Sequence, residues 1–575
     1  MTNRLLLARV ALPLMVACAG PAALQSAALA PRTVTVGILA INDFHGAIEP
    51  PKQSVIAPDG KGGSAQVPAG GAAWLASAVR ILRGQYANSA TVTAGDLISA
   101  SQLASSIYLD EPTIGVANRI GIDFSAVGNH EFDRGRQELL RMQRGGCKQY
   151  TPRKPCQVER FTGARFKFLA ASTITENGKP LFPAFGIKSY GQGARKVTVG
   201  FIGLTLKGTT DLVSPGGIKG LVFRDEARTI NALVPQLKAK GADAVVVLIH
   251  QGGQQDKPTD PNSCSGFSGE IAPILDQLDP RVDVVVSGHT HRAYVCDYGQ
   301  INPAHPVLLT SAGNYGTMLT DIALEIDPVT NKVVAKRARN LIVQSQAYVG
   351  SRGPIPLSPY YPVYAPDKAV AAYVQLYVDA AKAFAQRPAG HLAAPAAGAA
   401  LGQLIADAQL DATRAAGAQI ALMNPFGVRA PIVPATDGSV KFADIYAAQP
   451  FANTLVTQSF SGAELKAALE QGFDENGPYQ ALIPSAGLTY GYDMSRPAGD
   501  RVVDLRFNGQ PIDPAATYRV TTNSFLAQGG DSFTLLARQK DGVIGVSDLD
   551  ALEAWLKGAD LRAVPEAVRA VEVKP

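Results

Sequence analysis

The stretch Ala126-Val127-Gly128-Asn129-His130-Glu131-Phe132-Asp133 decides how the rest of this 575-residue chain is interpreted. An apolar run ends at Gly128, and side chains that can bind a metal ion or move a proton follow immediately. A carboxamide beside an imidazole is unusual at a strand end if the residues only pack, because both side chains need partners. The stretch therefore predicts a functional site at the carboxyl end of a strand.

Four other places repeat this arrangement, in which an apolar strand ends in residues that bind metals. They are Asn42-Asp43-Phe44-His45-Gly46, Ala94-Gly95-Asp96, Leu248-Ile249-His250 and Ser287-Gly288-His289-Thr290-His291. The chain has seven histidines, and only His305 and His391 lie outside the five strand ends. In open α/β sheets ligands bind at the carboxyl ends of the strands, so we expect the five ends to converge.

Two divalent metal ions about 3.5–4 Å apart need a bridging carboxylate and separate nitrogen and oxygen ligands. Asp96 is the natural bridge because it stands alone after its strand. The other ligands that we expect are Asp43, His45 and His291 for one ion, and Asn129, His250 and His289 for the other. On an extended segment His289 and His291 point the same way. The donor set suits Zn, Mn, Fe or Co better than calcium, and Mg also remains open.

His130 and Asp133 remain for roles other than metal binding. A protonated His130 would stabilise charge on phosphoryl oxygens or protonate a leaving alkoxide. Asp133 would then hold the ring and its tautomer. The competing interpretation is that Asp133 caps a helix that begins near Arg134.

At this length a single core is not expected, so the chain should contain two or more domains. Short apolar strands alternate with helical patterns, which favours a layered α/β domain. We expect strands at residues 33–42, 90–94, 196–204, 243–249, 282–286 and 307–310. Helices are expected at 71–83, 111–120 and 225–240, and residues 50–71 predict a loop because they are rich in Gly and Pro.

Residues 350–366 carry five prolines and predict a semi-rigid linker. A helix is expected at residues 367–386, and residues 388–400 are small and predict an irregular stretch. A second, smaller α/β domain is expected to follow. In it, Ser461 and Glu464 have the spacing of a capping box that opens a helix.

Residues 1–30 have the plan of a secretory signal peptide, with Arg4 and Arg9 before an apolar stretch and small residues up to Ala30. We expect a periplasmic or secreted protein, with lipid attachment at Cys18 as a minor alternative. No other segment reaches the ~18 apolar residues of a spanning helix.

Four cysteines follow the leader, and an even number in an exported chain suggests disulfides. Of the three possible pairings, Cys147–Cys156 with Cys264–Cys296 closes the shortest loops. Zinc-binding thiolates are the alternative, although no Cys-x-x-Cys pair occurs. The formal charge of +5 is small and no Lys/Arg cluster stands out, so a nucleic-acid polymer is not expected as a partner. The oligomeric state is not predicted.

Three segments of the C-terminal half carry polar and aromatic residues that suit a binding slot. The first segment, residues 424–429, follows a predicted strand at residues 419–423. The second segment, residues 449–453, precedes another predicted strand. The third is a glycine-bearing loop at residues 523–533. Two phenylalanines with an amide, a guanidinium and a carboxylate suit a flat base and its polar edge. The residues are Asn424, Arg429, Phe451, Phe525 and Asp531. The alternative is that each Phe belongs to the core and that Asp531 is a turn residue.

The motifs Asp-x-His, Gly-Asp, Gly-Asn-His-Glu, a single His after a strand and Gly-His-x-His resemble, in order and spacing, those of calcineurin-like metallophosphatases. The C-terminal segments resemble the secreted 5′-nucleotidase / UDP-sugar hydrolase family. This resemblance implies a four-layer α/β/β/α metallophosphatase domain at residues 31–348, a linker and linker helix at 349–390, and a substrate-binding α/β domain at 391–575. It supports the metal ligands and the pairing of His130 with Asp133.

The resemblance also implies that Phe451 and Phe525 sandwich a nucleobase, that Asp531 binds the ribose, and that Asn424 and Arg429 contact base and phosphate. Two departures from the family pattern are present. Pro425 and Phe426 stand where glycines are usual, and the region from Ala399 to Leu404 lacks the arginines that clamp phosphate. Arg414, in the next helical turns, is a candidate replacement.

The predicted function is a two-metal phosphohydrolase that releases phosphate from nucleotides, and from UDP-sugars as a further possibility, by attack of a metal-bridging hydroxide. The altered arginine region keeps two enzyme alternatives open, a 2′,3′-cyclic nucleotide phosphodiesterase and a sulfur-ester hydrolase on the same scaffold. The non-enzymatic alternative is a secreted protein that only binds nucleotides or metals. The partner expected is a small-molecule nucleotide.

Overall fold

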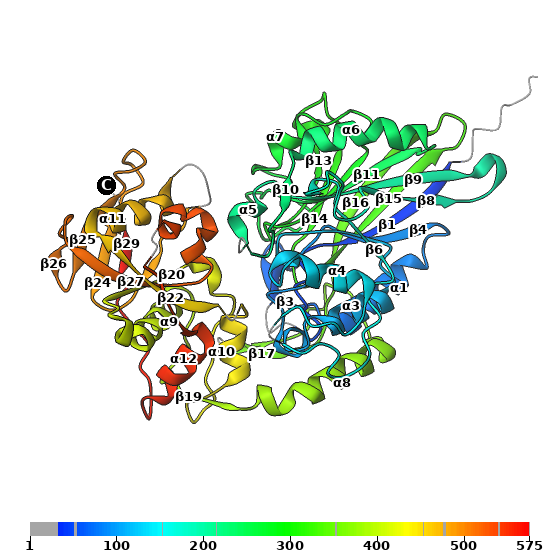
Figure 1. The fold of residues 1–575 in the computed structure, drawn as a ribbon. Helices are drawn as coiled ribbons and strands as arrows, with labels where there is room; N and C mark the ends of the chain where they lie inside the picture. Colours follow the sequence, from blue (N-terminus) through cyan, green and yellow to red (C-terminus); the bar gives the residue numbers. More distant parts are fainter. Residues whose placement is uncertain are drawn as a thin grey trace, which may run out of the picture.

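Two six-stranded β-sheets lie face to face in the N-terminal half of the chain (Figure 1). The computed structural model describes residues 33–573 except 51–53, 152, 214–215, 351–352, 452, 475–478 and 539–540. The expected leader and Cys18 lie outside the described residues. Across the first sheet the strands are β16 (Lys332–Ile342), β15 (Met318–Asp327), β1 (Val34–Ile41), β4 (Ser89–Thr93), β5 (Phe124–Ala126) and β6 (Lys167–Leu169). Across the second they are β13 (Ala293–Asp297), β14 (Leu308–Ala312), β12 (Val284–Ser287), β11 (Ala244–His250), β9 (Val197–Thr205) and β8 (Phe185–Tyr190).

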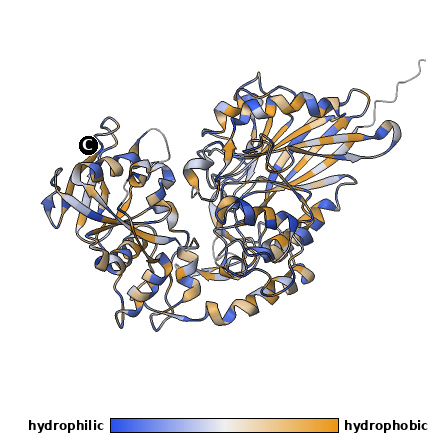
Figure 2. Cartoon of the chain, viewed as in Figure 1, coloured by the Kyte–Doolittle hydropathy of each residue, from blue (hydrophilic) through white to orange (hydrophobic). Residues whose placement is uncertain are grey.

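The inner faces of the two sheets form one apolar core. Phe124 on β5 meets Phe201 on β9, with ring centroids 5.1 Å apart. All residues of β9 and β11 are buried, which explains why these strands are almost continuously apolar in sequence (Figure 2).

Helices cover the outer face of each sheet. On the first sheet they are α1 (Ala72–Arg83), α3 (Glu111–Ile120) and α4 (Arg136–Arg144). On the second they are α6 (Glu226–Ala239) and α7 (Ala272–Leu275). The four layers are therefore α/β/β/α, and the predicted fold class is confirmed.

Strand direction explains how residues far apart in sequence reach one edge. β1, β4 and β5 run parallel to one another in the first sheet, and β9, β11 and β12 do so in the second. Parallel strands end on the same edge of their sheet, where ligand-type residues then gather.

A second α/β unit follows the long helix α8 (Lys368–Ala385) (Figure 1). Its five-stranded sheet has the order β23 (Ile483–Pro484), β20 (Ile420–Met423), β27 (Thr517–Asn523), β22 (Thr454–Ser461) and β28 (Val543–Ser547). A four-stranded sheet consists of β26 (Gln510–Pro511), β25 (Val502–Phe507), β24 (Leu488–Tyr492) and β29 (Ala570–Glu572). The helices are α9 (Gly398–Thr413), α10 (Phe442–Ala448), α11 (Gly462–Glu470) and α12 (Asp548–Lys557), and Ser461 and Glu464 form the predicted capping box of α11.

The loop predicted at residues 50–71 is wrong in part, because it contains a hairpin of β2 (Ser54–Pro58) and β3 (Ser64–Pro68). The Asp59 side chain accepts the N–H groups of Lys61 and Gly63 and closes the turn. Ala57 and Val67 pack into a small core beside the first sheet. The many Gly and Pro residues concealed this short alternating pattern.

The irregular stretch predicted at residues 388–400 is also wrong in part. β19 (Pro388–His391) pairs with β21 (Ser439–Lys441), and α9 already begins at Gly398. The partner strand lies about fifty residues away, and α9 has no capping side chain at its start, so neither element has a local signal. The remaining short elements are α2 (Leu103–Ser106), α5 (Thr209–Leu212), β7 (Thr173–Thr175) with β10 (Leu221–Phe223), and β17 (Tyr348–Gly350) with β18 (Gly353–Ile355).

Both disulfides have the pairing that closes the shortest loops. Cys147–Cys156 and Cys264–Cys296 join Cα atoms 5.6 and 5.0 Å apart. All four thiols are consumed, so the zinc-thiolate alternative is wrong. None of the described helices combines the length and the apolar composition needed to cross a membrane.

Helix α8 is held on the N-terminal domain by tyrosines. Tyr373 fits over Gly115 of α3 and stacks under the guanidinium of Arg119, whose carbon lies 3.4 Å from the ring centroid. The hydroxyls of Tyr373 and Tyr377 both donate to Glu159. Asp367 caps the helix by accepting the N–H groups of Ala369 and Val370.

We expect Gly115→Ala to destabilise the N-terminal domain. A Cβ at this position would lie 2.0 Å from the Tyr373 hydroxyl oxygen. Overpacking of this kind costs about 1–3 kcal/mol, and the better helix propensity of alanine offsets up to ~1 kcal/mol of it. Because a 2.0 Å contact is a severe overlap, we expect the upper part of that range, and a urea titration should show a net loss of roughly 1–2 kcal/mol.

Gly545→Ala is the control for this prediction, because its Cβ would meet Thr413 at an ordinary 3.5 Å. An increase in the stability of Gly115→Ala would mean that helix propensity prevails and that α8 is not fitted to this glycine.

Candidate metal centre and active site

The five predicted strand ends meet at one place between the sheets. β1, β4 and β5 deliver residues from the first sheet, and β11 and β12 deliver them from the second. His289 and His291 are half-buried. The remaining candidates are at most 3% exposed, and they are Asp43, His45, Asp96, Asn129 and His250.

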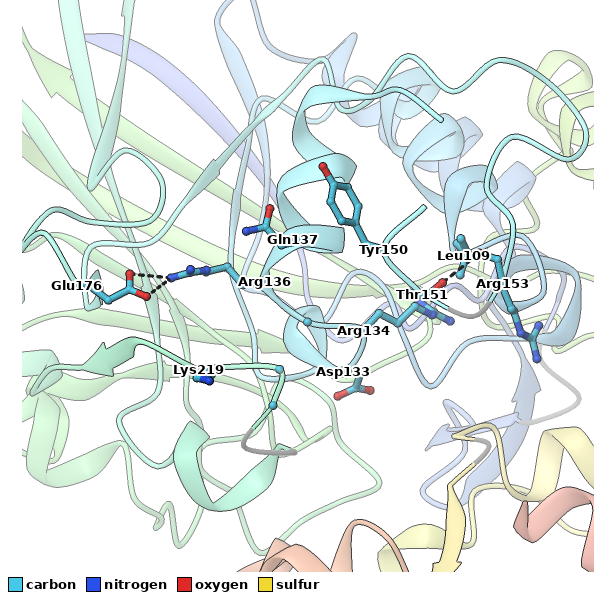
Figure 3. Close-up of a pocket in the computed structure, with 13 residues that line it drawn as sticks. Leu109, Asp133, Arg134, Arg136, Gln137, Tyr150, Thr151, Arg153, Glu176 and Lys219 are labelled. Atoms are coloured by element: carbon cyan, nitrogen blue, oxygen red, sulfur yellow. Dashed lines mark hydrogen bonds and ion pairs between the residues drawn. The ribbon is translucent and has the colours of Figure 1, made fainter. Parts of the chain in front are cut away.

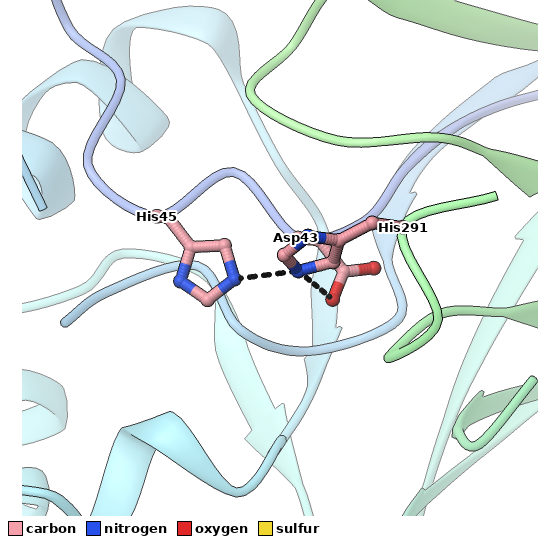
Figure 4. A group of neighbouring side chains, drawn as sticks. All are labelled: Asp43, His45 and His291. Atoms are coloured by element: carbon pink, nitrogen blue, oxygen red, sulfur yellow. Dashed lines mark hydrogen bonds and ion pairs between the residues drawn. The ribbon is translucent and has the colours of Figure 1, made fainter. Parts of the chain in front are cut away.

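Two groups of three side chains have donor atoms close enough to share an ion. In the first, Asp43, His45 and His291 place their donor atoms within 4.8 Å of one another (Figure 4). The Nε2 atoms of His45 and His291 are 3.1 Å apart, and Oδ1 of Asp43 lies 3.5 Å from His291 Nε2. Asp96, His250 and His289 form the second group by the same criterion.

Asp96 connects the two groups. Its Oδ2 lies 3.0 Å from His250 Nε2 and 3.7 Å from His45 Nε2. The Asn129 side-chain oxygen lies 3.1 Å from the same His250 nitrogen. The geometry thus brings together all seven residues that we predicted, and the Asp96 carboxylate lies between the two groups.

Backbone carbonyls fix the ring orientation of two histidines through Nδ1, the ring nitrogen that faces away from the centre. His45 Nδ1 lies 3.0 Å from the Ser99 carbonyl oxygen, and His250 Nδ1 lies 2.8 Å from that of Ala94. A carbonyl only accepts, so each Nδ1 must donate and each Nε2 is directed to the centre. This is the outer support usual for histidine ligands of metals, and the donor set fits divalent cations.

Burial and charge agree with this assignment. Burial lowers the pKa of His45 and of His289 to about 3, so both rings are neutral and keep a lone pair. Burial opposes protonation of His250 as well, yet the Asp96 carboxylate outweighs it and raises the His250 pKa to about 10. A proton and a divalent cation therefore compete for the same position between His250 and Asp96.

Five of the seven candidate ligands have left-handed backbone conformations. Their φ angles are 49° for Asp43, 47° for His45, 49° for Asp96, 72° for His289 and 57° for His291. Such angles are uncommon for residues other than glycine, and they concentrate at functional sites. The extended segment predicted for His289 and His291 is therefore wrong, although both rings still reach the centre.

His130 and Asp133 form a hydrogen-bonded pair, with His130 Nδ1 2.7 Å from Asp133 Oδ2. α4 begins only at Arg136, with Gly135 before it, so the capping interpretation of Asp133 is wrong. Burial would lower the His130 pKa, but the Asp133 and Asp96 carboxylates outweigh it and raise this pKa.

The C-terminal domain reaches this pair. Arg429 Nη2 lies 3.3 Å from His130 Nε2, and the Phe451 ring is stacked on the His130 ring at 6.0 Å. The Arg429 guanidinium carbon also lies 5.2 Å from the Phe451 ring centroid. Two of the predicted substrate residues thus lie directly against the predicted catalytic histidine.

The other substrate residues form a hydrogen-bonded group. Asn424 Nδ2 donates to Asp531 Oδ2 at 2.8 Å, and Asn523 Nδ2 donates to the Asn424 oxygen at 3.0 Å. Phe525 packs flat against Gly530, where a Cβ would lie 2.5 Å from its ring. Its ring makes no contact with that of Phe451 in the part of the chain that the structure describes.

The departures from the family pattern have structural roles. Gln403, in the region without arginines, donates to the Ala567 carbonyl and accepts the N–H of Arg569. Arg414 forms a surface ion pair with Asp411, and its side chain is 65% exposed. Phe426 lies on the surface in a short helix with Pro425.

Glu131 belongs to the site, although no role is predicted for it from the sequence. Its buried carboxylate accepts the N–H groups of Gly128 at 2.5 Å, Leu97 at 2.7 Å and Asp96 at 2.9 Å. It therefore holds the ends of β4 and β5 together. Its place three residues after Gly128, in the stretch with the strongest motif, is the signal that could have identified it.

We expect Glu131→Gln to weaken metal binding about 10–100-fold, the usual effect of removing outer support from a ligand. The amide nitrogen would face N–H donors that now have a carboxylate oxygen. Metal titration with a competing chelator measures this. Glu325→Gln is the control, since Glu325 accepts from Thr35 near the opposite end of β1. Equal affinities for Glu131→Gln and the wild type would show that the backbone of Asp96 needs no such support.

Known proteins share this arrangement. Residues 36–293 match the family described as calcineurin-like phosphoesterase, and residues 383–538 match the 5′-nucleotidase C-terminal domain. Bovine 5′-nucleotidase is 26% identical over 88% of this chain and 84% of its own length. Endonuclease YhcR of Bacillus subtilis is 29% identical over 92% of this chain, which covers only 40% of that relative.

A solved structure has the same overall architecture. The 5′-nucleotidase precursor of Thermus thermophilus superimposes with a TM-score of 0.72 and is 27% identical, over 94% of this chain and 100% of that one. The two family matches follow one another along the chain in the order of the two structural units. The chain belongs to the calcineurin-like phosphoesterases that carry a 5′-nucleotidase C-terminal domain, a family of metal-dependent phosphoester hydrolases.

Proposed function

We propose that this protein is an exported two-metal phosphohydrolase that releases phosphate from nucleotides. The observation that carries the proposal is the pair of ligand groups joined through Asp96. One divalent ion would be held by Asp43, His45, His291 and Asp96, and the other by Asp96, Asn129, His250 and His289. When bound, such ions activate water and neutralise the charge on the phosphoryl oxygens.

His130 and Arg429 would act on the phosphoryl group from the other side. A guanidinium only donates, so its contact with His130 Nε2 favours a neutral ring, whereas the two carboxylates favour a protonated one. A phosphoryl oxygen between the two side chains would let both donate. His130, oriented by Asp133, would then pass its proton to the leaving alkoxide.

The nucleoside would lie between Phe451 and Phe525. Asn424 and Asp531, which are hydrogen-bonded to each other, would bind polar groups of the nucleoside. The Asp531 carboxyl group is buried, and burial raises its pKa. Because water solvates this group poorly, ribose hydroxyls would be favourable hydrogen-bond partners for it. Support comes also from relatives that are named 5′-nucleotidase.

The alternatives gain no support of their own. A protein that only binds nucleotides or metals has no need for the His130–Asp133 pair beside the ligands. Phosphate release over a panel of nucleotides, UDP-sugars and 2′,3′-cyclic nucleotides, each with added Mn, Zn, Co or Mg, tests the substrate class. Hydrolysis of cyclic nucleotides alone would overturn the proposal.

We expect His250→Ala to bind fewer than two metal equivalents and to lose at least about 10³-fold in kcat, because metal ions contribute several kcal/mol to catalysis. Metal analysis of purified protein and phosphate release measure the two effects. His305→Ala is the control, since the His305 ring hydrogen-bonds to the Leu278 carbonyl and belongs to neither ligand group. Two full equivalents and normal turnover in His250→Ala would refute the metal assignment.

We expect Phe525→Ala to raise KM for AMP by roughly tenfold or more, since stacking on a base contributes about 1–3 kcal/mol. Hydrolysis of p-nitrophenyl phosphate should change far less, because this substrate has no nucleobase. Phe426→Ala, a surface phenylalanine of the same domain, is the control. Equal effects of Phe525→Ala on both substrates would remove its base-stacking role.

A further inference from the structure

The hydroxyl of Tyr446 lies where the two domains meet. Tyr446 belongs to α10 of the C-terminal domain and is only 1% exposed. Its hydroxyl donates to the Pro450 carbonyl oxygen at 3.0 Å and is also hydrogen-bonded to the hydroxyl of Ser106, which ends α2 in the N-terminal domain. Tyr446 is neither a candidate metal ligand nor a candidate nucleoside-binding residue. The proposed reaction therefore gives this buried hydroxyl no role.

The contact belongs to a packed apolar interface. Leu103, the first residue of α2, is buried in the core of the C-terminal domain together with Ile445 and Tyr446. Ile107, which follows α2, packs against the same core. Burial raises the pKa of Tyr446, so its hydroxyl keeps the proton that it donates. Because a buried hydroxyl without partners costs stability, the bonds of Tyr446 constrain how the two domains fit.

The position of Ser106 is tied to the candidate metal centre. Arg134 Nη2 donates to the Ser106 hydroxyl oxygen at 2.9 Å, and Arg134 Nη1 donates to the buried Asp110 carboxylate. The same carboxylate accepts the N–H of Ser99 at 3.0 Å. The Ser99 carbonyl oxygen in turn lies 3.0 Å from Nδ1 of His45, a candidate metal ligand. A short network thus relates the partner of Tyr446 to the ligand.

Arg134 also relates this contact to the candidate catalytic histidine. Figure 3 shows the side chains of Asp133 and Arg134 pointing in different directions from adjacent positions, at the wall of a cavity of about 860 Å³. Asp133 binds His130 at 2.7 Å, whereas Arg134 reaches Ser106. The segment that orients His130 therefore also anchors the residue that Tyr446 contacts.

On its other side Tyr446 holds the peptide unit that precedes Phe451. The Pro450 carbonyl belongs to the planar unit that joins Pro450 to Phe451, and proline fixes its own φ angle. A bond to this carbonyl therefore restricts the point from which Phe451 extends. The Phe451 ring is stacked on the His130 ring, with centroids 6.0 Å apart and 21° between the planes. Tyr446 thus links Phe451 to the domain that carries His130.

We propose that Tyr446 is a positioning residue for nucleotide substrates, and that its bonds to Ser106 and Pro450 set the Phe451 ring relative to His130. The inference rests on the proposed function, in which Phe451 stacks on a nucleobase. Such stacking holds the bound substrate and the transition state alike, so loss of the Tyr446 hydroxyl should change KM rather than kcat. A substrate without a nucleobase should not respond to it.

The test compares the wild type, Tyr446→Phe and Ser106→Ala with AMP and p-nitrophenyl phosphate as substrates. Tyr490→Phe is the matched control, because Tyr490 is another buried tyrosine of the C-terminal domain whose hydroxyl donates to a backbone carbonyl, that of Leu482 at 2.7 Å. Inhibition of p-nitrophenyl phosphate hydrolysis by adenosine reports on nucleobase binding without hydrolysis of a nucleotide. Urea titration of each variant checks that it is folded.

Tyr446→Phe should raise KM for AMP and the inhibition constant of adenosine by roughly tenfold, the effect of losing one buried hydrogen bond whose partners stay buried. Turnover of AMP and both constants for p-nitrophenyl phosphate should stay unchanged. Ser106→Ala should raise the same two constants, because Tyr446 then has no hydroxyl to bind in the N-terminal domain. Tyr490→Phe should lose stability without any change in KM.

A double variant tests whether Tyr446 acts through Phe451. In a Phe451→Ala background, Tyr446→Phe should raise KM for AMP no further, because the ring that it positions is gone. Additive effects of the two substitutions would overturn the proposal. A wild-type KM in Tyr446→Phe or in Ser106→Ala would do so as well, and so would an equal rise in KM for both substrates.

These outcomes are separable from failure of the proposed function. If the protein hydrolyses p-nitrophenyl phosphate but no nucleotide, the inhibition constant of adenosine still decides the role of Tyr446. If AMP is hydrolysed and Tyr446→Phe keeps the wild-type constants, only the positioning role is refuted. If AMP is not hydrolysed and adenosine does not inhibit, nucleobase binding and this inference are refuted together.

Discussion

A buried carboxylate placed between imidazoles of two different sheets is the constraint on which the rest of this structure depends. Asp96 follows β4, His45 follows β1, and His250 ends β11 in the other sheet. Asp43, also fully buried, lies in the same centre. Buried carboxylates are stable only when they are compensated, and burial keeps the rings of His45, His289 and His291 neutral. Among these ligands only His250, whose pKa Asp96 raises to about 10, offers a positive charge for two carboxylates. Divalent cations would supply the charge that is missing, so the architecture and the chemistry share one electrostatic requirement.

The backbone around this centre is shaped to serve it. The left-handed angles at Asp43, Asp96 and His289 turn the chain sharply where each strand ends. At Gly128 any Cβ would lie 2.1 Å from an Asp96 oxygen, so only glycine fits at that position. The Glu131 carboxylate accepts the N–H groups of Asp96, Leu97 and Gly128, and the Asp43 carboxylate accepts that of His289. The turns and the glycine together allow side chains from five strands to approach one point.

The ligand set could be predicted from the sequence because each ligand follows an apolar strand, and parallel strands end together. The backbone conformation of those strand ends could not be predicted from the sequence. The spacing of His289 and His291 suggests an extended segment, whereas both residues have positive φ angles that tertiary contacts impose. The β2–β3 hairpin and β19 were missed because Gly, Pro and distant partners remove local signals. The stacking of Phe451 on His130 depends on how two domains meet, which no local pattern encodes.

The two disulfides have a consequence for where the molecule can mature. Cys147 and Cys156 close the small loop that carries Tyr150 and Arg153, and Cys296 ties β13, the edge strand of the second sheet, to Cys264. A chain kept under reducing conditions would lack both crosslinks, one of them in the sheet that supplies His250, His289 and His291. Completion of the sandwich is therefore in part a chemical event, and it belongs to whichever compartment supplies the oxidant.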